Sequence, residues 1–196
     1  MAKPINHKIR QVNNRKIIKP TRFGELCIIW SESNQIPRID RILLSQPGLT
    51  AERQASELYP DSRISSCKEI NAVASAINAC LKGEDVLFNL DIIDFSLCTP
   101  FQQSVLRATY AIPRGRVSTY GLIAAHVGIS DGARAVGNVM AGNPFPLIVP
   151  CHRVIRSDKH IGGYGGGVEA KRALLEREGI IFDQAEKVVC RKLYYD

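Results

Sequence analysis

Hydrophobic and polar positions in the first hundred residues follow two patterns, one typical of strands and one typical of a helix. Residues 25–31 and 39–44 are rich in β-forming residues and are separated by a Ser-Asn-Gln-Ile-Pro stretch, which predicts two strands of a small sheet joined by a turn. In residues 66–82 hydrophobic positions recur at helical spacing, which predicts an amphipathic helix that covers the sheet. Residues 85–95 predict a last extended segment, and a boundary is expected near residues 96–99.

The second half of the chain predicts three short helices connected by tight turns. The first begins at residues 99–102, where Thr99 and Gln102 can form a capping box around a proline at the first helical position. The second covers residues 118–127, and the third begins at Ser130 or Asp131 and ends near residue 141. Three such helices predict a helix-turn-helix unit, although a small helical bundle without a DNA role gives the same pattern.

The third of these helices consists almost entirely of small residues. Only Arg134 and Asn138 offer large polar side chains, whereas a helix that reads bases in the major groove normally presents several. Small residues allow a helix to approach the sugar-phosphate surface, which predicts binding in a shallow or narrow groove without sequence preference. The same composition suits packing between helices, so both interpretations stay open at this point.

The formal net charge of +7 is distributed unevenly. Residues 1–24 carry seven basic side chains and no acidic one, so the remainder of the chain is neutral. Within that remainder, residues 25–98 have six basic and eleven acidic side chains, and residues 99–182 have ten and five. We therefore expect contacts with nucleic-acid phosphates in the second half, and only non-specific attraction from the basic arm.

Composition excludes several classes of protein. With 196 residues, of which 45% are hydrophobic, the chain can form one large domain or two small ones and is not disordered. No apolar run reaches the length of about 18 residues that a membrane span needs, and no secretory signal is visible, so a cytoplasmic or nuclear location is expected. The six cysteines are widely spaced without a CxxC pair, which favours reduced thiols over disulfides or a zinc ribbon.

The most specific chemical feature is the pair Cys151-His152, which follows an apolar run. An ordinary thiol is mostly protonated at neutral pH, so a neighbouring base is needed to raise the thiolate fraction. Adjacent residues of an extended chain point to opposite sides, so contact between His152 and the sulfur requires a bend or a bridging water. The common alternative for such a pair is an inert, buried cysteine.

Glu178 is a candidate partner for His152. It is expected at the end of a helix over residues 167–178, where its charge faces the negative end of the helix dipole and needs compensation. A protonated imidazole supplies it, which predicts a Cys–His–Glu relay, and the alternative is a solvated terminal glutamate. Between them, residues 162–167 form a glycine-rich loop around Tyr164 that lacks the lysine of a phosphate-binding loop. A mobile loop that lets a flat ligand reach the thiol is the better interpretation.

Four motifs together resemble one protein family. They are Arg134-Ala-Val-Gly137, Gly142-Asn-Pro144, Pro150-Cys-His-Arg-Val154 and the glycine loop around Tyr164. In this order and spacing they resemble the methylated-DNA–protein-cysteine methyltransferases, also called alkylguanine-DNA alkyltransferases, over residues 22–182. The resemblance implies a single-turnover repair protein that transfers an alkyl group from O6-alkylguanine in duplex DNA to its own cysteine, with O4-alkylthymine as a further substrate. The target base is flipped out from the minor groove, because the alkylated oxygen is otherwise buried in the duplex.

The resemblance also implies roles for individual residues. The catalytic residues are Cys151 as alkyl acceptor, His152 as a base acting through a water, Glu178 as its orienting acid, Asn143 as a hydrogen-bonding support and Tyr120 as proton donor to the departing guanine. The substrate pocket consists of Pro146, Val154, Tyr164 and Gly165. The DNA contacts are Arg134, which fills the stack after base flipping, together with Tyr120, Gly121, Ala133 and Ser157. The partner that the resemblance implies is double-stranded DNA that contains O6-alkylguanine. It implies no cofactor, no metal ion, no membrane association and no obligate protein partner.

The fold that the resemblance implies is α+β. A ribonuclease H-like N-terminal half places a helix over a small sheet, and a winged helix-turn-helix-like second half carries the reactive cysteine. The expected parts are a flexible basic arm over residues 1–21, an α/β domain over 22–97, a DNA-binding and alkyl-acceptor domain over 98–182, and a tail over 183–196. Removal of residues 1–20 is therefore expected to weaken DNA binding at low salt and to leave alkyl transfer to free base intact.

Two features depart from the family pattern. Gly165 stands where the family often has serine, so a hydroxyl contact to the base is lost and a backbone N–H remains. The spacings of His7, Cys27, Cys67 and Cys80 do not match the zinc site of some relatives of human type, so no zinc is expected. Two other functions stay open: a damage-recognition or regulatory protein whose cysteine is unused, and a Cys-His hydrolase that turns over repeatedly.

Overall fold

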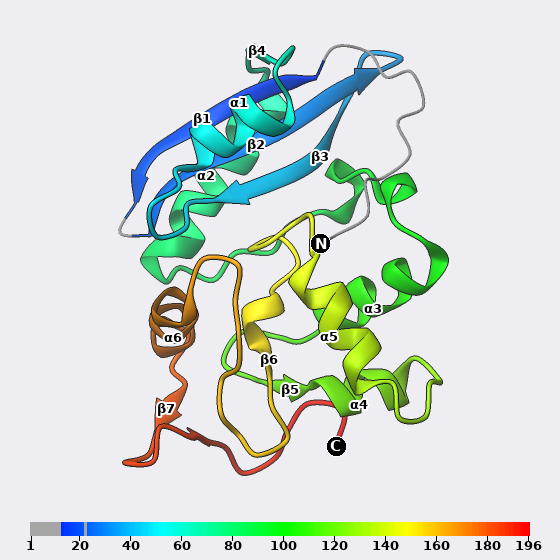
Figure 1. The fold of residues 1–196 in the computed structure, drawn as a ribbon, viewed down its shortest axis with the longest axis vertical. Helices are drawn as coiled ribbons and strands as arrows, with labels where there is room; N and C mark the ends of the chain where they lie inside the picture. Colours follow the sequence, from blue (N-terminus) through cyan, green and yellow to red (C-terminus); the bar gives the residue numbers. More distant parts are fainter. Residues whose placement is uncertain (1–12, 22) are drawn as a thin grey trace.

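A computed structural model describes residues 13–21 and 23–196, which form the mixed α+β structure of Figure 1. The strands are β1 (Asn14–Thr21), β2 (Gly24–Ser33), β3 (Ile36–Leu44), β4 (Arg63–Ile64), β5 (Ser118–Thr119), β6 (Val154–Ile155), β7 (Ile181–Phe182) and β8 (Val188–Val189). The helices are α1 (Ala51–Leu58), α2 (Lys68–Lys82), α3 (Pro100–Tyr110), α4 (Tyr120–His126), α5 (Ala133–Ala141) and α6 (Val168–Arg177), with short 3-10 helices at Leu90–Ile92, Phe95–Leu97 and Cys151–Arg153. The first four strands form one sheet of order β3-β2-β1-β4, at the top of Figure 1.

Residues 26–30 of strand β2 are hydrophobic without interruption because helices cover both faces of the sheet. One face packs against α1 in a cluster of Cys27, Ile29, Leu43, Ala51 and Ala55. The other face joins α2 in the main core through Leu26, Ile28, Trp30, Ile70, Ala74, Ile77 and Leu81. Since alternate side chains of a strand point to opposite faces, a continuous hydrophobic run serves both helices. The two predicted strands and the covering helix are thus confirmed, and α1 is an addition.

Strand β1 corrects the expectation of a flexible arm over residues 1–21. It pairs antiparallel with β2 and, at Asn14 and Arg15, parallel with β4, so it is an inner strand of the sheet. The side chain of Ile18 is buried. The segment has too few apolar residues to show alternation in the sequence, and its strand structure depends on pairing with β2. Residues 1–12 of the arm lie outside the described residues.

The predicted extended segment over residues 85–95 is interrupted by 3-10 turns at Leu90–Ile92 and Phe95–Leu97. In this described stretch only Ile93 makes a β-bridge, to Ile39, and two 3-10 turns precede α3. Asn89 and Asp94 start these turns, because the side chain of each accepts a hydrogen bond from the backbone N–H two residues on. The local side-chain bonds therefore compete with strand pairing here.

The three helices of the second half are present, with different ends. At the start of α3, the N–H of Gln102 donates to the Thr99 hydroxyl and the N–H of Thr99 donates to the Gln102 side chain, so the predicted capping box is confirmed. Strand β5 takes the first two residues of the predicted second helix. Helix α5 begins after Gly132, and Asp131 has a left-handed φ of 54°, so neither it nor Ser130 caps the helix.

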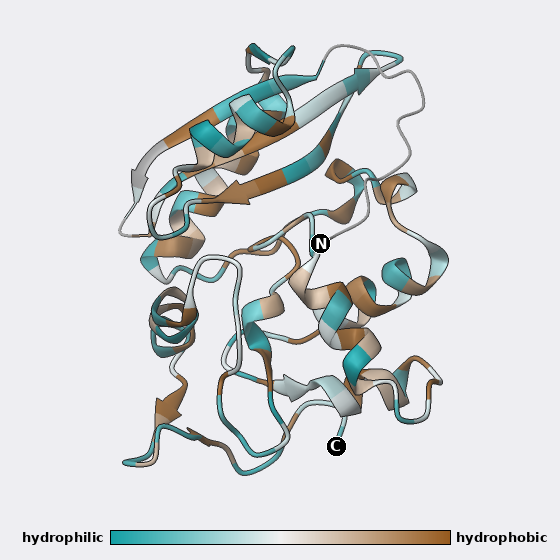
Figure 2. Cartoon of the chain, viewed as in Figure 1, coloured by the Kyte–Doolittle hydropathy of each residue, from teal (hydrophilic) through white to brown (hydrophobic). Residues whose placement is uncertain are grey.

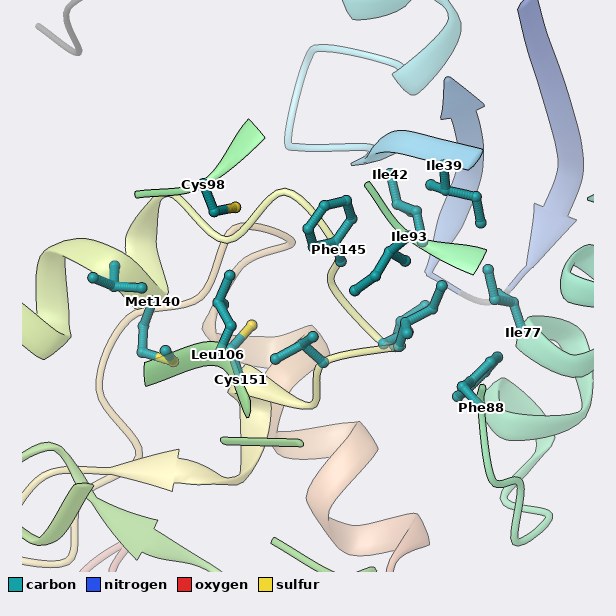
Figure 3. Close-up of a cluster of buried hydrophobic side chains, with 14 of the residues drawn as sticks. Ile39, Ile42, Ile77, Phe88, Ile93, Cys98, Leu106, Met140, Phe145 and Cys151 are labelled. Carbon is teal, nitrogen blue, oxygen red and sulfur yellow. The ribbon is translucent and has the colours of Figure 1, made fainter. Parts of the chain in front are cut away.

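One hydrophobic cluster joins the two halves of the chain. Figure 3 labels its members from the N-terminal part of the chain and from the second half side by side: Ile39, Ile42, Ile77, Phe88, Ile93, Cys98, Leu106, Met140, Phe145 and Cys151. The edge of β3 also contacts the second half directly, because the N–H of Ile42 donates to the carbonyl of Pro144 at 2.7 Å. The sheet therefore supports the segment that leads to Cys151.

The C-terminal residues continue the fold beyond α6. Strands β7 and β8 pair as an antiparallel hairpin with Ile181 opposite Val189, so the expected tail over residues 183–196 begins inside this hairpin. Figure 2 shows β7 as a hydrophobic strand at the periphery, where Ile181 is exposed. Among the described residues, no helix has both the length and the apolar character needed to cross a membrane.

Removal of residues 1–20 is predicted to destabilise the sheet, contrary to the expectation from charge alone. The deletion takes away most of β1, so β2 and β4 lose their common partner and the buried Ile18 is lost. We expect the free energy of unfolding in urea to fall by at least about 2 kcal/mol, the lower end for loss of one buried isoleucine. Removal of residues 1–12 leaves β1 in place and is the control; equal stability of the two deletions contradicts the inner position of β1.

Candidate functional site

Cys151 lies in a short 3-10 turn between an apolar segment and β6. The N–H of Arg153 donates to the carbonyl of Pro150 at 2.9 Å and closes the turn. The side chain of Cys151 is 7% exposed, and that of His152 is fully buried. Because the chain is bent here, the alternation of an extended strand does not apply to Cys151 and His152.

Glu178 holds the residues that follow Cys151. It caps the C-terminal end of α6, is 8% exposed, and accepts a hydrogen bond from His152 Nε2 at 2.9 Å through Oε1. Arg153 donates to both carboxylate oxygens at 2.8 Å, and its remaining nitrogen donates to the carbonyl of Ile112. Burial by itself raises the pKa of Glu178, but the hydrogen bonds from His152 and Arg153 outweigh it and lower the pKa to about 2.

This contact fixes the proton position on the imidazole. An ionised carboxylate only accepts hydrogen bonds, so Nε2 of His152 carries the proton that it donates to Glu178. Burial lowers the pKa of His152 despite the opposing effect of Glu178, which leaves the ring neutral with an unprotonated Nδ1. That Nδ1 is buried and has no hydrogen-bond partner among the described residues. The imidazole thus offers a free proton acceptor.

The thiol itself is in an apolar position. Burial raises the pKa of Cys151, while the Asn143 side chain and the positive charge of Lys171 oppose this increase. Asn143 also supports the chain before the cysteine, because its Nδ2 donates to the carbonyl of Val149 and its Oδ1 accepts from the N–H of Phe145. The resting thiol is therefore protonated and depends on a nearby base to ionise.

Lys171 is a site residue that the sequence analysis missed. Its side chain is fully buried, and its Nζ donates to the carbonyls of Val154 at 2.6 Å and Gly163 at 3.3 Å. Burial lowers its pKa to about 8, against the opposing charge of an ionised Cys151. No ion pair joins Lys171 to a carboxylate within the described part of the chain. The sequence could have indicated its burial, because Lys171 lies one helical turn before Leu174 and so on the same, hydrophobic face of the predicted helix.

Arg153 was also missed as a site residue, although it belongs to the Pro-Cys-His-Arg motif. The sequence offered a signal for it: Arg153 directly follows Cys151 and His152, and Glu178 was already expected to need a positively charged partner. Its guanidinium binds both carboxylate oxygens, the geometry in which arginine pairs most strongly.

Two tyrosines lie near the thiol. The ring of Tyr164 packs edge-on against His152 with 6.4 Å between centroids, and its pKa is raised by burial and by the negative charge of an ionised Cys151. Burial and the same charge raise the pKa of Tyr120, while Arg156 lowers it. A Cβ at Gly162 would lie 3.4 Å from the Tyr120 hydroxyl, so the glycine loop approaches this hydroxyl closely.

The other predicted residues belong to two groups, the pocket and the DNA contacts. In the pocket set, Val154 is buried, and its carbonyl accepts the hydrogen bond from Lys171. Pro146 is buried in the segment before Cys151, and Gly165 is exposed on the glycine loop. The residues predicted to contact DNA are exposed, apart from the half-buried Tyr120: Gly121, Ala133, Arg134 and Ser157. The structure thus brings Cys151, His152 and Glu178 into one buried group, with the partly buried Asn143, Tyr120 and Tyr164 around it and exposed residues beside it.

The chemistry open to this group is nucleophilic attack by an activated thiol. Within the described residues, no group of three or more His, Cys, Asp or Glu side chains lies together as a metal site. His7, which the sequence analysis weighed as a zinc ligand, lies outside them.

Comparisons of the sequence and of the fold with known proteins point to the same family. Residues 100–180 match the family model described as 6-O-methylguanine DNA methyltransferase, DNA binding domain. The chain is 46% identical over 111 residues to the methylated-DNA–protein-cysteine methyltransferase of Methanothermobacter thermautotrophicus, covering 57% of this chain and 62% of that relative. It is 41% identical over 133 residues to the protein of that name from Mycobacterium tuberculosis, covering 66% of this chain and 79% of the relative.

Solved structures of similar fold extend the comparison to the N-terminal half. The crystal structure of Mycobacterium tuberculosis O6-methylguanine methyltransferase matches with a TM-score of 0.67 and 31% identity, over 85% of this chain and 92% of that one. The structure of Mycobacterium tuberculosis OGT in complex with DNA matches with a TM-score of 0.64 and 30% identity, over 84% and 92%.

Replacement of Glu178 by glutamine is predicted to destabilise the fold in a pH-dependent way. The folded-state pKa of about 2 lies below the ordinary 4.5, so ionised Glu178 stabilises the fold above about pH 4.5, and this contribution is lost as the pH falls toward 2. We expect Glu178→Gln to lower the free energy of unfolding by about 3 kcal/mol at pH 7, because Arg153 keeps a buried, uncompensated charge. The difference should shrink in urea titrations below pH 4.

The control is Glu176→Gln, which removes an exposed carboxylate that pairs with Arg172 on the same helix. It should change stability little at any pH. A loss in Glu178→Gln that stays constant down to pH 3 contradicts the ion pair as its cause.

Proposed function

This chain belongs to the methylated-DNA–protein-cysteine methyltransferase family, and we propose that its Cys151 accepts an alkyl group from the O6 atom of guanine in duplex DNA, once per molecule. The observation that carries the proposal is the buried group of Cys151, His152 and Glu178 within the region that matches the family model. O4-alkylthymine is a further candidate substrate. The reaction needs a nucleophile and a proton donor but no cofactor.

Activation of the thiol begins at His152. Its unprotonated Nδ1 takes the proton of Cys151 through a bridging water, and Glu178 stabilises the imidazolium that forms. The thiolate appears only as the base accepts the proton, because burial keeps the resting thiol protonated. Lys171 adds a positive charge near the new thiolate, and Asn143 supports the chain around it.

The transfer is an in-line displacement. The thiolate attacks the alkyl carbon, a carbon–sulfur bond forms, the bond from carbon to O6 breaks, and its electron pair stays on the guanine. Tyr120, whose raised pKa keeps its hydroxyl protonated, donates the proton that neutralises the departing base. The product is a thioether, and since no step regenerates the thiol, the reaction stops after one turnover.

The flipped base occupies a pocket formed by Pro146, Val154, Tyr164 and Gly165. Lys171 supports this role because it binds the carbonyls of Val154 and Gly163, and so holds a pocket wall and the glycine loop together. Gly165 contributes backbone groups only. A base inside the duplex is out of reach of a buried thiol, so flipping from the minor groove is part of the proposal.

The DNA surface is assigned to the exposed residues beside the site. Arg134 on α5 fills the gap in the base stack, Tyr120 presses on the phosphate backbone, and the small residues Gly121 and Ala133 permit close approach, with Ser157 on the neighbouring loop. Helix α5 also packs against α4 near Tyr120, so its small residues serve both interpretations given above.

At the level of the fold, we propose a ribonuclease H-like N-terminal domain over residues 22–97, extended by β1, and a winged helix-turn-helix-like domain over 98–182. The β3-β2-β1-β4 sheet with its helices and the α3-α4-α5 arrangement support this assignment. A DNA substrate also favours a cytoplasmic location, or a nuclear one in a eukaryote.

The direct test is the mass of the intact protein after incubation with a duplex that carries O6-methylguanine. We expect a single gain of one methyl group, absent from Cys151→Ala. Binding of the damaged duplex without a mass gain favours a damage-recognition protein. Repeated turnover of an ester or peptide, without stable modification, favours a hydrolase. Either result contradicts alkyl transfer.

Arg134→Ala is predicted to impair repair of duplex DNA more than reaction with free O6-alkylguanine base. The free base needs no flipping, so only the duplex reaction loses the side chain that stabilises the extruded state, a cost of a few kcal/mol for unstacking. We expect a loss of about tenfold or more in the duplex rate constant and less than about twofold with free base, measured by Cys151 alkylation. Equal losses on both substrates contradict the proposed role.

A further inference from the structure

The segment after β8 folds back onto the DNA-binding half, although it lies beyond the residues that match the family model. The match ends at residue 180, and residues 190–196 run from the hairpin toward β5 and α4. In Figure 1 this segment is drawn in red and ends beside α4. Of its two tyrosines, Tyr194 contacts the residues just before α4, and Tyr195 contacts the last residue of that helix.

Tyr194 borders the strand that leads into α4. Its N–H donates to the carbonyl of Val117 at 2.8 Å, and the hydroxyl of Ser118 donates to the carbonyl of Tyr194 at 2.7 Å. On its other side, β5 pairs with β6. Since Tyr120 follows β5 directly and β6 directly follows the turn that holds Cys151, this small sheet determines how the two reacting groups lie relative to each other.

Tyr195 holds the other end of α4. Its ring stacks on His126, the last residue of that helix, with 3.9 Å between centroids and an interplanar angle of 25°. Its hydroxyl donates to the carbonyl of Ala108 in α3 at 2.8 Å. Tyr195 has a φ of 72°, a conformation that costs energy for any residue other than glycine, so these contacts hold it against strain.

Helix α4 needs such external contacts. With seven residues it is too short to be stable through its own hydrogen bonds, and packing has to fix its orientation. A hollow of about 600 Å³ lies between α3 and the end of α4, lined by Arg107, Ala108, His126 and Gly128, with Tyr195 at its wall. Helix α5 packs against α4 near Tyr120, and the Tyr195 ring covers the other end of α4, at His126 beside this hollow.

We propose that Tyr194 and Tyr195 are positioning residues that fix the orientation of α4 and thereby the placement of the Tyr120 hydroxyl against Cys151. The inference rests on the proposed function, because Tyr120 acts there as the proton donor. It assigns a role to a segment that the sequence analysis treated as a tail.

A double-mutant cycle with full-length protein tests the inference. The rate constant of Cys151 alkylation at saturating methylated duplex is measured for Tyr195→Ala in the native and in the Tyr120→Phe background. We expect a loss of about tenfold in the native background and less than about twofold in Tyr120→Phe, because residues that act through one another are not additive. Tyr195→Phe keeps the ring stacked on His126 and should stay within about threefold of the native protein.

The matched control is Tyr59→Ala, which removes a partly buried tyrosine from the N-terminal half, where it packs against the α1 cluster. It should lower stability without any coupling to Tyr120. Equal losses from Tyr195→Ala in both backgrounds overturn the inference, because the segment then stabilises the fold without orienting Tyr120.

Amide hydrogen exchange separates a failure of this inference from a failure of the proposed function. Tyr195→Ala should speed exchange in residues 122–126 of α4 relative to the native protein and leave α2 unchanged. Unchanged exchange in α4 overturns the inference even where the native protein is fully active. Faster exchange in a protein that does not take up the methyl group supports the positioning of α4 and contradicts the proposed function alone.

Discussion

The site is organised around the buried carboxylate of Glu178, which binds the two residues that follow the buried thiol. Glu178 keeps its charge only because Arg153 binds both of its oxygens and His152 donates to one of them. The same contact decides which imidazole nitrogen carries the proton, and so leaves Nδ1 as the acceptor. The ion pair therefore stabilises the fold and prepares the base in one arrangement, and its loss removes both effects together.

The apolar surroundings of Cys151 oppose ionisation of its thiol. Burial raises the thiol pKa, and the compensating groups come from different parts of the chain: Asn143 before the cysteine and Lys171 from α6. The hydrophobic core that the two halves share explains how Asn143 and Lys171 keep their positions relative to Cys151. The edge of β3 binds the carbonyl of Pro144, so the N-terminal sheet supports the segment that carries Asn143 and Cys151. Since burial keeps the resting thiol protonated, the proposed reaction needs a base, and the free Nδ1 of His152 is the group proposed for it.

The sequence was sufficient to predict those elements and contacts that depend on one local pattern of residues. The capping box at Thr99 and the apolar runs of β2 and β3 give local signals, and the predicted pairing of His152 with Glu178 follows from charge at a helix end. It was insufficient where structure depends on distant partners. Strand β1 forms because β2 and β4 lie beside it, and Lys171 is buried because carbonyls of two other segments accept its hydrogen bonds. The predicted extended segment over residues 85–95 is interrupted by turns because the side chains of Asn89 and Asp94 each accept a hydrogen bond from the backbone N–H two residues on.

If Glu178 acts through His152 to ionise Cys151, replacement of Glu178 must change the pH dependence of alkylation by free O6-alkylguanine base. With the free base as substrate, the measured rate does not depend on DNA binding. The rate-against-pH profile of Glu178→Gln should move to higher pH than that of the native protein, while Glu176→Gln, a change at an exposed carboxylate, should keep the native profile. Superimposable profiles for the native protein and Glu178→Gln, with both proteins folded, contradict the relay.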